Sequence, residues 1–280
     1  MCELLGMSAN VPTDICFSFS GLMQRGGNTG PHRDGWGITF YEGKGFRTFK
    51  DPNPSYSSKI AELVTDYPIK SCAVVSHIRQ ANRGGVSLEN THPFTRELWG
   101  RYWTFAHNGQ LTGYDSLATG RFRPVGDTDS EVSFCWLLNQ LEERYPQPPE
   151  DMTEMFKFVA ECCEQLKQLG VFNMLLSDGE YVMTFCTNHL YWITRRAPFG
   201  KATLLDEDMT VNFQEETTPN DVVTVVATQP LTGNETWQRM KPGEFNLFHF
   251  GELQASNVEA LHDIPFAAPK PGNQAPTEPL

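Results

Sequence analysis

The residue best suited to chemistry in this chain is its second. Cys2 directly follows Met1, and methionine is normally removed when the next side chain is as small as that of cysteine. Removal would place a thiol nucleophile on the same residue as an α-amine whose reference pKa is about 7.7 to 8.0. Such a residue supplies both nucleophile and base for covalent catalysis. A Met-Cys start also arises by chance or at a buried or palmitoylated cysteine, so the rest of the chain must decide.

A second candidate is the dipeptide Asn108-Gly109, at the end of an apolar stretch. Asn-Gly is the commonest signal for a type I′ hairpin turn, and the dipeptide alone favours that interpretation. The catalytic interpretation is an oxyanion hole, in which the Asn amide and the Gly backbone N–H point at a developing negative oxygen. Glycine would let the backbone approach closely.

Two charged residues are suited to holding the ends of an amino acid. Arg79 ends an apolar strand-like run, and its guanidinium could bind a carboxylate through two parallel hydrogen bonds, which lysine cannot do. The alternative for Arg79 is a solvated strand end. Asp129, within the string at 126–131, could pair with an ammonium group. Asp, Thr and Ser before an apolar helix are also expected helix-capping residues, and the two roles are compatible.

His92 stands in the string THPF, where a packed structural histidine is favoured over a ligand. The seven cysteines are scattered and show neither a disulfide framework nor a CxxC zinc spacing. The sequence therefore predicts no metal and no cofactor, and it fits a reducing, cytoplasmic compartment.

Charge narrows the choice of partners. The chain has 280 residues, a net charge of -12 and no cluster of lysine and arginine, which argues against nucleic acid or an anionic membrane as partner. No basic residue precedes Arg25 and no long apolar run follows Met1. We therefore expect neither a signal peptide nor a transmembrane helix.

The elements that must position these residues follow from apolar periodicity. Apolar residues at helical spacing predict helices at 14–24, around Phe134–Leu141 and around Met155–Cys162. Strands are expected at 2–8, 38–41, 46–49, 72–78, 102–106, 171–177, 180–187, 189–194, 222–228 and 244–250. Because strands and helices do not alternate regularly, the pattern predicts an α+β fold with two packed sheets covered by helices.

Six strings then occur in order: Met1-Cys2, DGWG at 34–37, SHIR at 76–79, THPF at 91–94, HNG at 107–109 and GDTDSE at 126–131. Together they resemble the class II glutamine amidotransferase domain, an N-terminal-nucleophile (Ntn) hydrolase, and most closely its short stand-alone bacterial branch. The resemblance covers most of the chain, with a weaker echo at 227–231 and 237–243. It implies a four-layer αββα sandwich of two mainly antiparallel sheets. We expect one type-2 amidotransferase domain over residues 1–262 and a Pro-rich tail over 263–280.

The resemblance also implies roles. Cys2 would attack the side-chain amide of glutamine and form a thioester, while its own α-amine takes the thiol proton, through water. Asn108 and the Gly109 N–H would stabilise the oxyanion, Arg79 would hold the substrate α-carboxylate, and Asp129 its α-ammonium. The products would be glutamate and ammonia.

Two departures from the family leave alternatives open. Gln80-Ala81-Asn82-Arg83 stands where many relatives have Thr followed by His or Ser, so the substrate preference could differ. A chain of 280 residues has no room for a second synthase domain, so we expect a free-standing amidohydrolase, alone or beside a separate synthase or hydrolase subunit. The alternatives are a γ-glutamyl peptide hydrolase acting on glutathione-type peptides or ergothioneine precursors, and a non-catalytic regulatory subunit. A glutaminase needs only a small closed pocket, whereas a peptide hydrolase needs an open leaving-group side.

Overall fold

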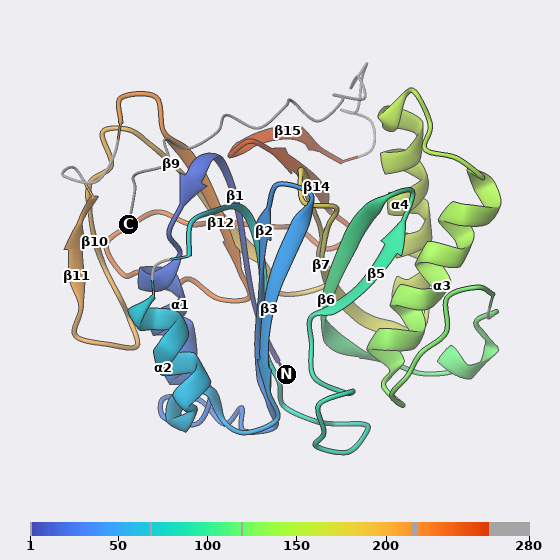
Figure 1. Ribbon diagram of the computed structural model, residues 1–280, viewed down its shortest axis with the longest axis horizontal. Coiled ribbons are helices and arrows are strands. Elements are labelled where there is room, and N and C mark those ends of the chain that lie inside the picture. Colours follow the sequence, from blue (N-terminus) through green and yellow to red (C-terminus); the bar gives the residue numbers. More distant parts are fainter. Residues whose placement is uncertain (1, 68, 119, 214–217, 258–280) are drawn as a thin grey trace, which may run out of the picture.

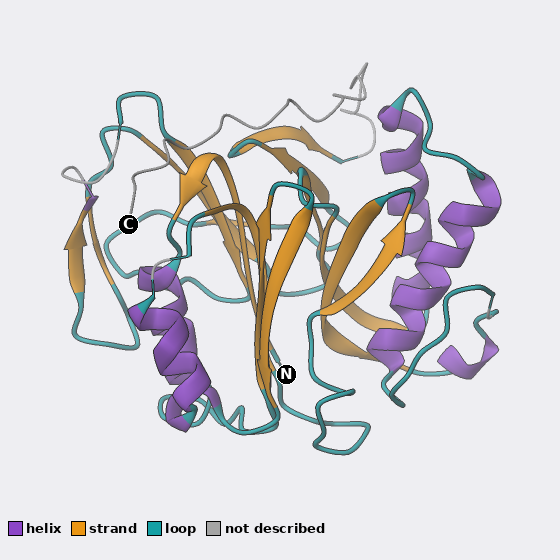
Figure 2. Ribbon diagram, in the orientation of Figure 1, coloured by secondary structure: helices purple, strands orange, loops and turns teal. Residues whose placement is uncertain are grey.

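The computed structural model describes residues 2–67, 69–118, 120–213 and 218–257. Two β-sheets lie face to face, and a pair of helices covers the outer face of each (Figure 1). Figure 2 shows the same four layers coloured by type of secondary structure. The predicted α+β, four-layer αββα sandwich is therefore confirmed. The helices are α1 (Cys16–Arg25) and α2 (Lys59–Asp66) on one side, and α3 (Asp129–Arg144) and α4 (Met152–Lys167) on the other.

The first sheet has seven strands in the order β13-β9-β12-β1-β4-β2-β3, and neighbouring strands pair antiparallel. Its central strand, β1, begins one residue after Cys2 and pairs with β12 and β4. The chain therefore presents Cys2 at the end of a central strand. The strands are β1 (Glu3–Thr13), β2 (Trp36–Glu42), β3 (Gly45–Asp51), β4 (Ser71–Ile78), β9 (Tyr191–Arg196), β12 (Val222–Ala227) and β13 (Gln238–Arg239).

The second sheet has six strands in the order β15-β14-β8-β7-β6-β5, again antiparallel. A separate two-stranded pair, β10 and β11, lies outside both sheets. The strands are β5 (Phe94–Leu98), β6 (Arg101–Leu111), β7 (Gly170–Ser177), β8 (Tyr181–Phe185), β10 (Lys201–Thr203), β11 (Thr210–Asn212), β14 (Phe245–His249) and β15 (Glu252–Ser256). Short 3-10 turns occur at Ser55–Ser57 and Tyr114–Ser116.

Strand β6 corrects one prediction. It continues five residues beyond the predicted end at Ala106, and its pairing with β7 runs through to Leu111 opposite Gly170. Asn108 and Gly109 consequently lie inside a strand, and the hairpin-turn interpretation of this dipeptide is wrong. The β7 partner strand supplies the pairing, which no local pattern in the sequence reveals.

Successive side chains of β1 point to opposite faces of the first sheet. Leu5 and Met7 pack among the apolar side chains beneath α1 and α2, whereas Leu4 packs between the two sheets. Cys2 is two residues before Leu4, and side chains two residues apart along a strand point to the same face. The thiol is therefore expected on the side of the chain that faces the second sheet.

Helix α2 and several short strands were not predicted, and one predicted segment lies outside the described residues. Helix α2 is short, and Leu63 on it is exposed. The predicted Pro-rich tail at 263–280 lies outside the described residues, so the domain boundary at 262 stays a prediction. No helix in the described ranges is long and apolar enough to cross a membrane.

Candidate active site

The Cys2 thiol lies half-buried beside the end of β4. The Gln80 N–H donates to Sγ at 3.3 Å, and the thiol donates to the Gln80 carbonyl at 3.5 Å. Burial raises the pKa of the Cys2 thiol, while the hydrogen bond from Gln80 and the charge of Arg79 act in the opposite direction. The thiol is therefore neutral near pH 7 and needs a base before it can attack a carbonyl carbon.

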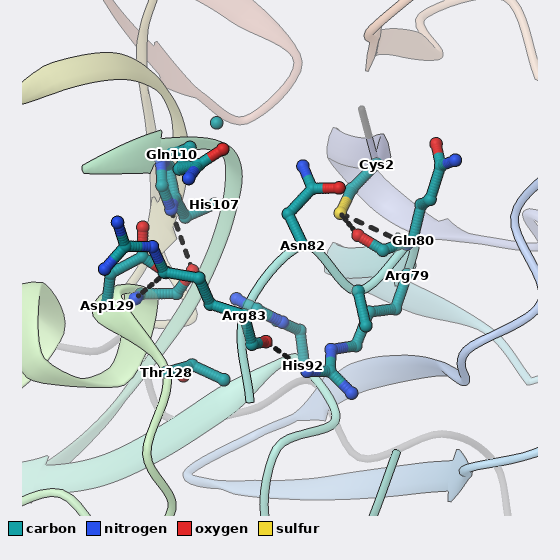
Figure 3. A pocket seen from close by; sticks show the side chains of 13 residues that line it. Cys2, Arg79, Gln80, Asn82, Arg83, His92, His107, Gln110, Thr128 and Asp129 are labelled. Atoms are coloured by element: carbon teal, nitrogen blue, oxygen red, sulfur yellow. Dashed lines mark hydrogen bonds between the residues drawn. The ribbon is translucent and has the colours of Figure 1, made fainter. Parts of the chain in front are cut away.

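Four predicted residues meet at one cavity. Cys2, Arg79, Gly109 and Asp129 all belong to its wall, although they come from four separate segments of the chain. Figure 3 labels Cys2, Arg79 and Asp129 around this space. The cavity has a volume of about 30 Å³, enough for water but not for an amino acid. The fold thus brings a thiol, a basic residue and an acidic residue to one small space.

Asn108, the fifth predicted residue, is fully buried next to this wall. Its Nδ2 donates to Thr228 Oγ1 at 3.2 Å, and its Oδ1 has no hydrogen-bond donor among the described residues. Gly109 has a packing reason for being glycine, since a Cβ there would overlap the Val171 carbonyl oxygen and meet the His107 ring. The close approach of β6 to β7 therefore requires glycine at position 109.

Arg79 is buried, with 3 % of its surface exposed, so the alternative of a solvated strand end is wrong. Its guanidinium donates to the carbonyl oxygens of Gly85 at 2.8 Å, Arg83 at 2.9 Å and Gly84 at 3.3 Å. Arg79 is therefore held by the segment that directly follows it, and this segment also forms part of the cavity wall (Figure 3).

Asp129 is the first residue of α3. The predicted helix start is correct, but the capping side chain is Thr128, whose hydroxyl accepts from the Glu131 N–H at 3.2 Å. The Asp129 carboxylate accepts from the Leu111 N–H at 2.7 Å and the Ser130 N–H at 3.0 Å. It therefore joins the end of β6 to the start of α3 while forming part of the cavity wall.

Three histidines form a buried group that was not predicted from the sequence. The rings of His77 and His92 are stacked with centroids 4.1 Å apart, and His77 Nε2 lies 3.2 Å from the His107 carbonyl oxygen. His107 Nδ1 lies 2.8 Å from Ser130 Oγ. Burial lowers the pKa of all three, that of His77 and His92 well below the ordinary value. The three rings are therefore neutral at pH 7.

The preference for a packed histidine at position 92 agrees with its burial, yet His92 also reaches the cavity wall. Both of its ring nitrogens, and Nδ1 of His77, lack a partner among the described residues. The signal available in the sequence was that the strings SHIR, THPF and HNG each contain one of the three histidines.

Within the described ranges, no group of three or more His, Cys, Asp or Glu side chains is arranged to hold a metal ion.

Comparison with known proteins places this site in a family. The family model described as class II glutamine amidotransferases matches residues 1–270. The chain is 73% identical over 252 residues to Escherichia coli K12 YafJ, whose name assigns it to the glutamine amidotransferases; the match covers 90% of this chain and 99% of YafJ.

Solved structures agree. A predicted glutamine amidotransferase from Pseudomonas aeruginosa PA01 superposes with a TM-score of 0.74 and 54% identity, covering 91% of this chain and 100% of that one. The Bacillus subtilis glutamine phosphoribosylpyrophosphate amidotransferase gives a TM-score of 0.59 at 15% identity, over 91% of this chain and 49% of that one, which shows a shared fold. The chain therefore belongs to the class II glutamine amidotransferases.

Proposed function

We propose that this protein is an amidohydrolase in which Cys2, once Met1 is removed, cleaves the side-chain amide of glutamine. One observation carries the proposal: the thiol of Cys2 shares a cavity wall with a guanidinium and a carboxylate, the two groups needed for the ends of an amino acid. Arg79 and Asp129 supply them. A protein that only bound glutamine would have no chemical need for the thiol.

The reaction proceeds through a thioester. The Cys2 α-amine removes the thiol proton through a water molecule, and Sγ attacks the amide carbon of the substrate. The Asn108 amide and the Gly109 N–H stabilise the oxyanion of the tetrahedral intermediate. The protonated α-amine then gives its proton to the substrate nitrogen, and collapse of the intermediate breaks the C–N bond and releases ammonia. Water then attacks the thioester, which releases glutamate and restores the thiol.

The raised pKa of the thiol supports a base-dependent step of this kind. A thiol that ionised freely would not need the amine. We therefore expect kcat/KM for glutamine to rise with pH through the titration of the amine, whose reference pKa is about 7.7 to 8.0.

The cavity must widen before a substrate can bind. Its volume of about 30 Å³ is too small for glutamine and for any larger γ-glutamyl compound. Even glutamine requires the segment after Arg79 to shift, because the guanidinium is occupied by the carbonyls of residues 83–85. The substrate carboxylate would replace those carbonyls.

The test is intact-mass spectrometry before and after treatment with a diazoketone analogue of glutamine. We expect a mass without Met1, one label on Cys2, and protection by glutamine. The Cys2→Ser variant should take no label. Retained Met1, or no labelling of Cys2, would contradict the proposal and favour a non-catalytic subunit, whereas a higher kcat/KM for γ-glutamylglycine than for glutamine would favour the peptide hydrolase.

A further inference from the structure

The hydroxyl of Thr228 lies between the strand that follows the nucleophile and the predicted oxyanion donor. Thr228 Oγ1 accepts from the Leu4 backbone N–H at 2.9 Å and lies 3.2 Å from Asn108 Nδ2. The Thr228 N–H donates to the Leu4 carbonyl at 3.2 Å. Thr228 directly follows β12 and has 2 % of its surface exposed. One buried side chain thus connects β1, two residues after Cys2, to Asn108 on the opposite sheet.

In this orientation of the Asn108 amide, the donors and acceptors of Asn108 and Thr228 do not match. A threonine hydroxyl has one proton to donate and two acceptor positions. The acceptor positions of Thr228 are used by Leu4 and Asn108, and no described residue accepts its proton. Asn108 Oδ1, meanwhile, is buried without a donor among the described residues. A spare donor and a spare acceptor therefore belong to two side chains already in contact.

Turning the Asn108 amide by 180° about its terminal torsion removes this mismatch. The oxygen then takes the position 3.2 Å from Thr228 Oγ1 and accepts its proton, while Leu4 continues to donate to the hydroxyl. The two amide orientations differ only in which of oxygen and nitrogen occupies each position, and the hydrogen-bond network decides between them. The NH₂ group then occupies the buried position that has no protein partner.

We propose that Thr228 is a positioning residue that donates its hydroxyl proton to Asn108 Oδ1 and so turns the Asn108 N–H groups toward the oxyanion of the reaction. This inference rests on the proposed amidohydrolase function and adds a residue to it. In the opposite orientation Asn108 would present a carbonyl oxygen to a developing negative charge, which repels it. The same hydroxyl accepts a hydrogen bond from the Leu4 N–H, so one side chain contacts both the strand that begins after Cys2 and the proposed oxyanion donor.

The test compares Thr228→Val, which keeps the shape but removes the hydroxyl, with Thr228→Ser, which keeps the hydroxyl. Loss of one oxyanion donor typically costs about 100- to 1,000-fold in kcat. Because Thr228→Val frees the amide rather than deleting it, we expect kcat for glutamine hydrolysis to fall about 10- to 100-fold with little change in KM. Thr228→Ser should stay within about threefold of the wild type.

A structural control separates positioning from packing. Thr224 lies on β12, is fully buried, and donates to the Gly251 carbonyl at 2.7 Å. Thr224→Val should lower the melting temperature about as much as Thr228→Val and leave kcat unchanged. In an Asn108→Ala background, Thr228→Val should have almost no further effect on kcat, because it acts through the amide.

Three results would overturn the positioning role: wild-type kcat in Thr228→Val, an equal loss in Thr224→Val, or losses that multiply in the double variant. An inactive wild type that takes no label on Cys2 overturns the proposed function and this inference together. An active wild type with an equally active Thr228→Val overturns this inference alone.

Discussion

Two groups of buried polar side chains lie in the layer between the sheets, and they differ in how completely they are paired. The first, the tyrosine cluster, consists of Tyr41, Ser71, Thr104 and Ser177. Tyr41 Oη lies 2.7 Å from Thr104 Oγ1, 2.7 Å from the Tyr102 carbonyl and 2.9 Å from the Ser177 carbonyl. Ser71 Oγ lies within hydrogen-bond distance of the Tyr41 backbone. Burial raises the pKa of Tyr41, which keeps it a neutral donor.

The second, the site cluster, consists of Cys2, His77, His92, Asn108 and Thr228. Here Asn108 Oδ1, His77 Nδ1 and both nitrogens of His92 lack a partner within the described ranges. A buried polar atom without a partner costs free energy. The tyrosine cluster therefore joins the two sheets through paired groups, whereas the site cluster contains buried donors and acceptors that no described residue pairs.

The largest expected effect belongs to Cys2, the proposed nucleophile. Cys2→Ser should lower kcat for glutamine by about 10⁴-fold or more, because serine keeps the small side chain but loses the thiolate. Steady-state ammonia release measures it. Cys72→Ser, at another half-buried cysteine on β4, is the matched control and should stay within about twofold. Equal losses in the two variants would remove Cys2 from the chemistry.

Asn108, the proposed oxyanion donor, has the next largest expected effect. Asn108→Ala should lower kcat about 100- to 1,000-fold with a small change in KM, since the interaction forms in the transition state. Asn246→Ala on β14 removes an equally buried amide and should affect only the melting temperature. A KM effect without a kcat effect at Asn108 would assign the residue to substrate binding instead.

The tyrosine cluster should show the reverse pattern. Tyr41→Phe leaves the Tyr102 and Ser177 carbonyls without the phenol, which should cost about 1 to 3 kcal/mol of unfolding free energy. Turnover should be unchanged. Denaturant unfolding measures the loss, and exposed Tyr67→Phe should change it by less than about 0.5 kcal/mol. A drop in kcat for Tyr41→Phe would contradict the division into two clusters.

The smallest effect is a pH dependence of stability. The pKa values of His77, His92 and His107 are lowered in the folded state, so the unfolded chain binds more protons once the pH falls below about 6.5. Stability is therefore complete above that pH and is lost as the pH falls, by up to about 1.4 kcal/mol per pH unit for each neutral ring.

Unfolding at pH 6.5 and 5.5 measures this slope. His92→Gln should reduce it by up to about 1.4 kcal/mol per pH unit, whereas Tyr41→Phe should leave it unchanged. The same slope in His92→Gln and the wild type would show that His92 is protonated in the folded protein.

The elements that could be predicted from the sequence are those with a clear local pattern. Helices α3 and α4 have apolar residues at helical spacing, and the strands with continuous apolar runs, such as β4 and β12, were found close to their observed bounds. The predicted strand ends at Ala106 because His107-Asn108-Gly109 is polar, whereas β6 continues through these residues in its pairing with β7. Helix α2, short and partly exposed, lacked a signal long enough to identify.

The sequence by itself determined the chemical types: a cysteine at position 2, an arginine at a strand end, an Asn-Gly pair and an acidic helix start, in a family-specific order. The tertiary structure decided their meeting in one cavity and the link from Thr228 to Asn108, which are 120 positions apart. Such contacts depend on strand register and on how two sheets face each other. Pairing is set by the whole folded chain, since a shift of one residue in β6 would turn Asn108 to the other face.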